Sequence, residues 1–238
     1  MPGNGVSSLS GAPVRVAIVT LDNHLKGAVD RADAQLSQER IFLSLHAAAD
    51  WDRNPLHLER TKQAVARADI VIVSMLFLDD HIRAIMPALE ARRENCDAMV
   101  ALMSAAEVVR LTRMGPYRMD SPASGLMALL KKLRGSSKPG TSSGAGQMRM
   151  LRTLQYWLAG SDQNVVAMVR ALIDRYAAGD RLTRRGMTPA APPLHYPEVG
   201  VYHPRTDQKI SESLRLLPTR KGHNGTVGLL LLRSYLLG

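Results

Sequence analysis

The chain has 238 residues, of which 45% are hydrophobic and 22% charged, a composition that excludes a collagen-like or wholly disordered chain. This length suffices for one large or two small domains. Its single cysteine, Cys96, excludes an internal disulfide and a multi-cysteine zinc or iron–sulfur site within the chain, and favours a reducing cytoplasmic location. No secretory signal and no apolar run of about 20 residues is visible, so we expect no transmembrane segment.

The net charge of +10 is distributed unevenly along the chain. Residues 1–110 carry 12 basic and 14 acidic side chains, whereas residues 111–238 carry 19 and 7. A basic second half can meet nucleic acid, an anionic membrane face, an acidic partner subunit or a carboxylate-bearing ligand. Because its arginines and lysines are not interleaved with stacking aromatics or placed on a helix-turn-helix pattern, we expect no nucleic-acid partner.

The first hundred residues alternate short β-branched runs with stretches of helical periodicity. This pattern predicts strands at 14–21, 40–48, 69–78 and 98–104, and helices at 25–39, 55–67, 79–93 and 105–110. Such alternation is typical of right-handed βαβ units that build a parallel sheet covered by helices. The predicted fold class is therefore α/β, with a flavodoxin-like or Rossmann-like head domain.

Beyond Met114, glycines and prolines interrupt the alternation, and the pattern predicts several different segments. We expect a further α/β domain to start near the end of the chain, where a buried strand follows Gly225 with no helix after it; this favours the front part of a longer protein. The predicted division is a disordered N-terminus at 1–13, the head domain at 14–135, a Gly/Ser linker at 136–146, a helical segment at 147–178, a Pro/Arg-rich connection at 179–225 and the first strand of a further domain at 226–238.

The polar cluster Asp22, Asn23 and His24 follows the first predicted strand. Ligands of parallel sheets bind at the edge where strands end, so this turn is the first candidate for a binding site. The alternative is that Asp22 or Asn23 only caps the next helix.

Three further residues are candidates for substrate contact at the same edge. His46 lies on the second predicted strand, where it is either a ligand or base or a structural histidine. Glu107 and Arg110 lie on the helix after the fourth strand. The spacing alone does not decide whether these side chains converge with Asp22 and His24.

Other polar clusters favour structural roles over chemistry. Asp79, Asp80 and His81 offer ligands for a divalent ion, but consecutive helical residues point in different directions and acids suit a helix N-terminus. The histidines at 195 and 203 flank a proline-rich segment that binds a metal or macrocycle, or packs as turns. The Gly-rich stretch at 140–148 lacks the Lys-Ser/Thr ending of a phosphate-binding P-loop. We expect no metal site.

Eight collinear strings resemble the N-terminal part of the large H subunit of magnesium chelatase, and the match covers nearly the whole chain. They are VAIVTLDNHLKGAV, SLHAAADW, ADIVIVSMLFLDDHIRAIMPAL, VVRLTRMGPYRMD, SSGAGQM, TLQYWLAGSDQNV, YPEVGVYHP and TVGLLLLRSYLL. The chain is also similar to the large subunit of cobaltochelatase, which metallates a corrin ring. The family resemblance implies an additional helical, proline-containing segment at the point where Arg152 directly precedes Thr153 in this chain, so either a deletion or a stretch missing from the sequence is expected there.

The resemblance implies a bacterial, cytoplasmic, porphyrin-binding subunit in chlorophyll or bacteriochlorophyll synthesis. Its substrates would be Mg²⁺ and protoporphyrin IX, with ATP hydrolysed on two partner motor subunits, and peripheral membrane contact is a further option. No catalytic residues are expected in this segment, which alone would be inactive. A non-catalytic tetrapyrrole carrier and a cobaltochelatase-type subunit are the alternatives.

Overall fold

The computed structural model describes residues 11–119, 142–187, 189–197, 199–204, 209–213, 215 and 229–230. Four parallel strands form the centre of its main sheet, in the order β2-β1-β3-β4, and a short antiparallel hairpin extends the sheet beyond β4. The order is that of doubly wound flavodoxin-like sheets, which confirms the predicted fold class. The strands are β1 (Val14–Thr20), β2 (Ile41–Ala47), β3 (Ile70–Ser74), β4 (Ala98–Leu102), β5 (Arg113–Met114) and β6 (Tyr117–Arg118).

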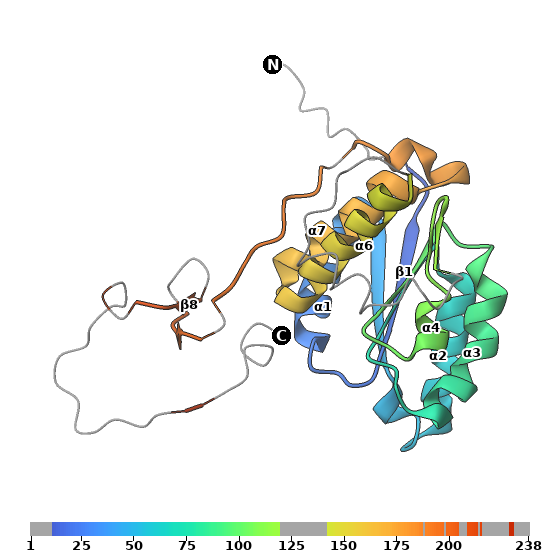
Figure 1. The fold of residues 1–238 in the computed structure, drawn as a ribbon, viewed down its shortest axis with the longest axis horizontal. Helices are drawn as coiled ribbons and strands as arrows, with labels where there is room; N and C mark the ends of the chain where they lie inside the picture. Colours follow the sequence, from blue (N-terminus) through green and yellow to red (C-terminus); the bar gives the residue numbers. More distant parts are fainter. Residues whose placement is uncertain are drawn as a thin grey trace, which may run out of the picture.

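Helices cover both faces of this sheet, as Figure 1 shows. One face is covered by α1 together with the later helices α6 and α7, and the other by α2 and α3. The predicted helices of the first hundred residues are present, with a one-turn helix after β4. Their bounds are α1 (Lys26–Leu36, followed by η1, Ser37–Glu39), η2 (Ala48–Asp50), α2 (Pro55–Arg67), α3 (Asp79–Arg93) and α4 (Ala106–Val109).

The local sequence explains where these elements begin and end. Asn54 accepts a hydrogen bond from the Leu56 backbone amide at 3.0 Å, and Pro55 occupies the first helical position, so α2 starts where predicted. The third strand is shorter than the predicted 69–78: it ends at Ser74, because Met75 adopts a left-handed backbone with φ of 59°.

Helix α6 (Ser142–Ala159) corrects the predicted linker at 136–146, because its first five residues lie within that range. The reason is packing: Gly146 is buried, and a Cβ atom there would overlap the ring of Tyr117 on β6. The glycine lets the helix lie closely on the hairpin, so this stretch has a packing role that its composition does not reveal. Residues 136–141 of the predicted linker lie outside the described residues.

Helices α6 and α7 (Asp162–Tyr176) confirm the predicted helical pair, and they pack on the sheet. Their apolar side chains share one core with Val16 and Ile18 of β1 and Ile72 of β3, so the pair completes the covering of the α1 face. Ser161 caps α7 by accepting the Asn164 backbone amide at 3.2 Å. Helix α6 runs without a break through Arg152 and Thr153.

A 3₁₀ helix, η4 (Gly179–Arg184), lies against the edge where the parallel strands begin. Arg181 contacts the carboxylates of Asp69 and Asp97, which precede β3 and β4, at 2.9–3.3 Å. The buried guanidinium of Arg184 donates to the carbonyls of Gly11 and Ala12 at 3.0 Å. Residues 11–13 are therefore held in place, which corrects the predicted disorder for that part of 1–13; residues 1–10 lie outside the described residues.

The predicted connection at 179–225 contains η4, an extended segment and a small antiparallel pair, β7 (Val201–Tyr202) with β8 (Ile210–Ser211). The strand predicted at 226–238 falls outside the described residues, apart from residues 229 and 230, which are exposed and not in a strand. Among the helices that the structure describes, none is long and apolar enough to cross a membrane.

Candidate functional site

The carboxyl edge of the sheet, where β1–β4 end, gathers most of the candidate residues. The connections after β1 and β3 leave toward opposite faces of the sheet, with α1 on one face and α3 on the other. In doubly wound sheets this reversal opens the crevice in which ligands bind. The residues that end β1 and β3 are thus the ones placed to meet a ligand.

Two hydroxyl groups stand side by side at this switch point. Thr20 ends β1, Ser74 ends β3, and the two are direct partners in the parallel register. Both lie two residues beyond core positions of the α1 face, so their side chains point to that face. Both residues are at most 1% exposed, and neither hydroxyl oxygen has a hydrogen-bond partner among the described residues. Buried polar groups usually have partners, so this pair is an unusual feature of the edge.

Asp22 and His24 form a pair in the turn after β1. The Asp22 carboxylate accepts from the His24 backbone amide at 3.2 Å and also contacts the imidazole Nδ1. Helix α1 begins after Leu25 without a side-chain cap, so neither Asp22 nor Asn23 caps it, and the capping alternative is wrong. The carboxylate instead orients the imidazole, with Asp22 the more exposed of the two.

His46 lies on β2 and faces α2, on the side of the sheet opposite Thr20. Its Nε2 lies 3.1 Å from the Ser44 hydroxyl. Burial, and next the charge of His57 at the start of α2, lower the pKa of His46 from 6.5. The imidazole is therefore neutral at physiological pH, when one ring nitrogen can accept a proton.

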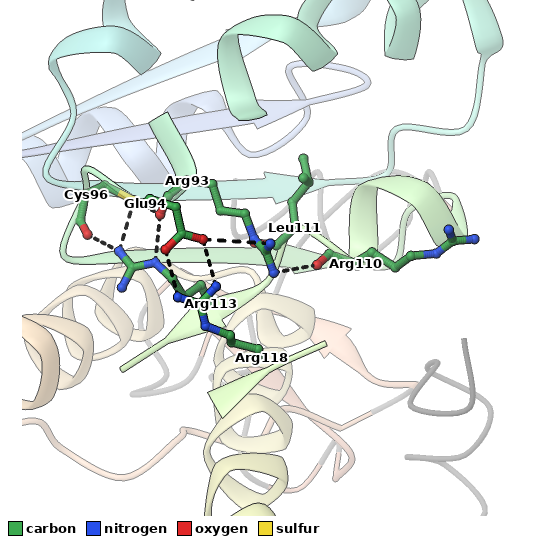
Figure 2. Close-up of polar contacts among 7 residues, drawn as sticks. All are labelled: Arg93, Glu94, Cys96, Arg110, Leu111, Arg113 and Arg118. Atoms are coloured by element: carbon green, nitrogen blue, oxygen red, sulfur yellow. Dashed lines mark hydrogen bonds and ion pairs between the residues drawn. The ribbon is translucent and has the colours of Figure 1, made fainter. Parts of the chain in front are cut away.

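Glu107 and Arg110 lie on and just after α4, and both are exposed. The Arg110 carbonyl accepts a hydrogen bond from Arg93 at 3.1 Å, but its side chain extends away from that contact (Figure 2). Among the described residues, no hydrogen bond or ion pair joins the side chain of either residue to Asp22, His24 or His46. The structure thus brings Asp22 and His24 together but leaves Glu107 and Arg110 apart from them.

The other predicted ligand clusters do not gather around a common point. Asp79 and Asp80 are exposed in the first turn of α3, whereas His81 is buried and lies edge-on to the Trp51 ring at 5.6 Å. Its Nε2 contacts Asp52 at 3.2 Å. No group of three or more potential metal ligands occurs in the described parts of the chain.

The opposite edge of the sheet carries a network of arginines, drawn in Figure 2, that joins the end of α3 to the β5–β6 hairpin. Arg118 holds Glu94 with two bonds of 2.7 Å, which lower the pKa of that carboxyl. Arg113 donates to the carbonyls of Arg93 and Cys96. Burial raises the pKa of the Cys96 thiol, so it stays protonated and unreactive. This network binds backbone carbonyls and stabilises the hairpin.

The carboxyl edge therefore combines hydroxyl groups, an oriented imidazole with its carboxylate, and a neutral histidine on the neighbouring strand. These groups can donate and accept hydrogen bonds to a polar substrate. Sequence analysis found Asp22, His24 and His46 but missed Thr20 and Ser74. The available signal was a polar residue that directly follows four apolar residues at the end of each strand, 16–19 before Thr20 and 70–73 before Ser74.

Comparison with known families divides the chain into two matches. Residues 15–159 match the model of a domain of unknown function, DUF3479, and residues 154–238 match the model CobN/Magnesium Chelatase. The first match ends with helix α6, and the second begins within it. The junction thus lies inside one continuous helix.

The curated relatives share one name. The magnesium-chelatase H subunit of Cereibacter sphaeroides is 44% identical over 256 residues, covering 98% of this chain and 21% of the relative. Its counterpart from Rhodobacter capsulatus is 44% identical over 245 residues, covering 93% and 20%. The chloroplastic magnesium-chelatase ChlH subunit of rice, Oryza sativa, is 23% identical over 274 residues, covering 100% and 20%. The chain spans about a fifth of the length of these relatives.

Proposed function

Since this chain belongs to the family of magnesium-chelatase H subunits, with DUF3479 as its first part, we propose that it is the porphyrin-binding H subunit, N-terminal portion, of a magnesium chelatase. The observation that carries the proposal is 44% identity along 98% of the chain. Identity at this level, extending from the head domain through the later helices, supports a shared role in the assembly as well as a shared fold.

The proposed reaction inserts Mg²⁺ into protoporphyrin IX on the way to chlorophyll or bacteriochlorophyll. As the family resemblance implies, ATP would be hydrolysed on two partner motor subunits, and the lack of a P-loop motif in this chain agrees with that. We place the complex in the bacterial cytoplasm, with peripheral membrane contact as an option. This portion would form part of the wall of the porphyrin-binding body or a docking surface for the motor subunits.

Within this portion, we assign substrate contact to the carboxyl edge. Asp22 and His24 are partly exposed and already paired, and the hydroxyls of Thr20 and Ser74, which end β1 and β3, have no partners among the described residues. Glu107 and Arg110 stay weaker candidates, since they stand apart on α4.

The test is a chimera. The matching region of the Cereibacter sphaeroides relative is replaced by residues 15–238 of this chain, and Mg-porphyrin formation is followed by fluorescence with the motor subunits, ATP and Mg²⁺. We expect ATP-dependent insertion, because the replaced region contributes the same surfaces. A relative from which that region is deleted serves as the control and should be inactive. A folded, inactive chimera would contradict the proposal.

Two further measurements separate the alternatives. A tetrapyrrole carrier would bind porphyrin as this chain alone, and neither ATP nor the motor subunits would change its affinity. The name of the second family model, CobN/Magnesium Chelatase, keeps a cobaltochelatase-type subunit as the other alternative. That alternative predicts Co²⁺ insertion into a corrin ring by a chimera built on a cobaltochelatase large subunit, and none by the magnesium chimera.

A further inference from the structure

A groove on the outer side of α6 and α7 is lined by arginines. The extended segment after η4 forms its third wall, and the groove encloses about 760 Å³. This volume is within the range of about 300–1,000 Å³ typical of sites for small molecules. We refer to it as the arginine groove, defined by Arg149, Arg152, Tyr156, Asp174, Arg175 and Tyr176.

The charges in the arginine groove are not balanced from within. Arg149, Arg152 and Arg175 make no side-chain ion pair or hydrogen bond in the described part of the chain, in contrast to Arg31, which pairs with an aspartate of α7. The groove's one acid, Asp174, accepts a hydrogen bond from the Gly186 backbone amide. Three guanidinium groups thus face a single carboxylate that is already engaged.

Two buried polar atoms of the arginine groove also lack partners. Neither the Arg149 Nε nor the Tyr176 hydroxyl oxygen has a hydrogen-bond partner among the described residues, and Tyr176 is only 8% exposed. Burial raises the pKa of the Tyr176 phenol, so the hydroxyl keeps its proton and is available as a donor. The hydroxyl of Tyr156, by contrast, donates to the Ala191 carbonyl at 2.6 Å. A buried donor without an acceptor is destabilising, and an anionic ligand would supply the missing acceptor.

The remaining lining is mostly apolar, with Thr153 as its other polar residue. Pro189, Ala190 and Pro192 of the extended segment face Leu172 and the tyrosine rings. A ligand that fits must therefore expose an apolar body to this wall and its negative charges to the arginines. Guanidinium groups prefer carboxylates and phosphates, which they bind through two parallel hydrogen bonds.

We propose that the arginine groove binds a small apolar molecule that carries at least two carboxylates. The charge imbalance and the unpartnered donors carry this inference on their own. The further identification of the dicarboxylate as a tetrapyrrole rests on the proposed function. It would place a porphyrin contact on α6 and α7, away from the carboxyl edge.

The test is a titration of the complete chain with deuteroporphyrin IX, which has two carboxylates, followed by quenching of tryptophan fluorescence. The dimethyl ester of the same porphyrin has no charge and serves as the matched ligand. We expect saturable binding of the diacid, at least tenfold tighter than that of the ester. Inorganic phosphate and an Asp/Glu-rich peptide are the competitors, and displacement of the porphyrin by the peptide at lower concentration would overturn the small-molecule assignment.

Substitutions distinguish binding in the arginine groove from a general effect of the chain's positive charge on affinity. The triple substitution Arg149→Gln, Arg152→Gln and Arg175→Gln should weaken diacid binding at least tenfold and leave ester binding unchanged. The control triple, Arg53→Gln, Arg60→Gln and Arg67→Gln, removes the same charge from exposed positions on and before α2, and should change the affinity less than twofold. Equal effects of the two triples, or no saturable binding of the diacid, would overturn the proposal.

Two more conservative variants keep the proposal testable if the triple substitution to glutamine prevents folding. Tyr176→Phe removes only the unpartnered hydroxyl, so it should weaken diacid binding a few-fold without lowering the melting temperature. The corresponding arginine-to-lysine triple keeps the charge but loses the planar fork, and should give an intermediate affinity. An active chimera without diacid binding would contradict the arginine-groove proposal and leave the proposed function standing. Diacid binding with a folded, inactive chimera would support the groove as a dicarboxylate site and contradict the proposed function.

Discussion

Arg181 shows how one side chain of the second half holds the first half of the chain together. Its guanidinium bridges the carboxylates of Asp69 and Asp97, which are 8% and 5% exposed. Arg181→Gln would leave two buried negative charges without their partner, and breaking such a pair typically costs about 3–5 kcal/mol. We therefore expect a loss of this size in the free energy of unfolding, measured by urea denaturation.

A matched control isolates this effect from loss of a positive charge in general. Arg83 pairs with Asp80 on the surface of α3, with both side chains largely exposed, so Arg83→Gln should cost at most about 1 kcal/mol. Adding Asp97→Asn to Arg181→Gln should restore part of the lost stability. Equal losses of unfolding free energy from the two arginine substitutions would contradict this stabilising role of Arg181.

The lowered pKa of His46 in the folded chain predicts that the free energy of unfolding depends on pH. Because its pKa is lowered in the folded state, the unfolded chain takes up a proton first as the pH falls through the ordinary value of 6.5. The histidine therefore favours folding above pH 6.5 and loses this contribution progressively below it, down to the folded-state pKa. We expect the free energy of unfolding to fall less between pH 7.5 and 5 in His46→Gln than in the unmodified chain, as followed by urea denaturation at each pH.

The neighbour of His46 provides the control. His57 is exposed and lowers the pKa of His46 through its charge, a smaller cause than burial. His57→Gln should thus raise the pKa of His46 slightly, which NMR titration of the imidazole can measure, and reduce the pH dependence without removing it. An unchanged pH profile in His46→Gln would show that other groups dominate.

At the scale of elements, the start of α6 depends on a glycine. Replacing a glycine inside a helix by alanine normally stabilises the helix by about 1 kcal/mol. Gly146→Ala should instead destabilise the protein by about 1–3 kcal/mol, because the added methyl group would overlap the ring of Tyr117 and force a shift of helix or hairpin. Thermal unfolding of the variant measures this.

The Tyr117→Ala background makes the cause testable. With the ring removed, Gly146→Ala should become neutral or stabilising, because only the helix propensity remains. A destabilisation that persists in this background would mean that Gly146 serves a purpose other than close packing on β6.

The same helix shows which elements the sequence could predict. The βα units of the first hundred residues follow local periodicity, and helix α2 begins where Asn54 and Pro55 mark it. The Gly/Ser composition near 142–146 indicated a linker, because glycine is unfavourable in an isolated helix. Tertiary contact with Tyr117 reverses that preference, and no local pattern encodes such a contact.

The candidate sites show the same contrast between local sequence patterns, which were predictable, and contacts between distant residues, which were not. Asp22 and His24 were predictable because they lie two positions apart in sequence and follow a strand. The pairing of Thr20 with Ser74 depends on strand register, which joins residues 54 positions apart. The arginine groove needs α6, α7 and the segment after η4 to meet, so the excess of basic residues predicted an anionic partner but not its place.

Across the whole molecule, the second half of the chain completes the fold of the first. Helices α6 and α7 share the core of the α1 face with α1, and Arg181 of η4 binds the carboxylates that precede β3 and β4. The boundary between the two matching family models falls inside α6, so it does not mark a boundary between independently packed units.

This dependence leads to a prediction for shortened chains. A chain ending at residue 119 would lack the α6 and α7 side chains that share one core with Val16, Ile18 and Ile72 of the sheet. Each large apolar side chain contributes about 1.5–3 kcal/mol when buried, so loss of the whole α6–α7 cover matches or exceeds a typical net stability of about 5–15 kcal/mol. We expect this chain to bind a hydrophobic dye and to unfold without a cooperative transition. A chain ending at residue 196 keeps both helices and η4, and should unfold cooperatively without binding the dye. Cooperative unfolding of the shorter chain would instead show that the strands and the first helices form a complete domain, with α6 and α7 as an addition to it.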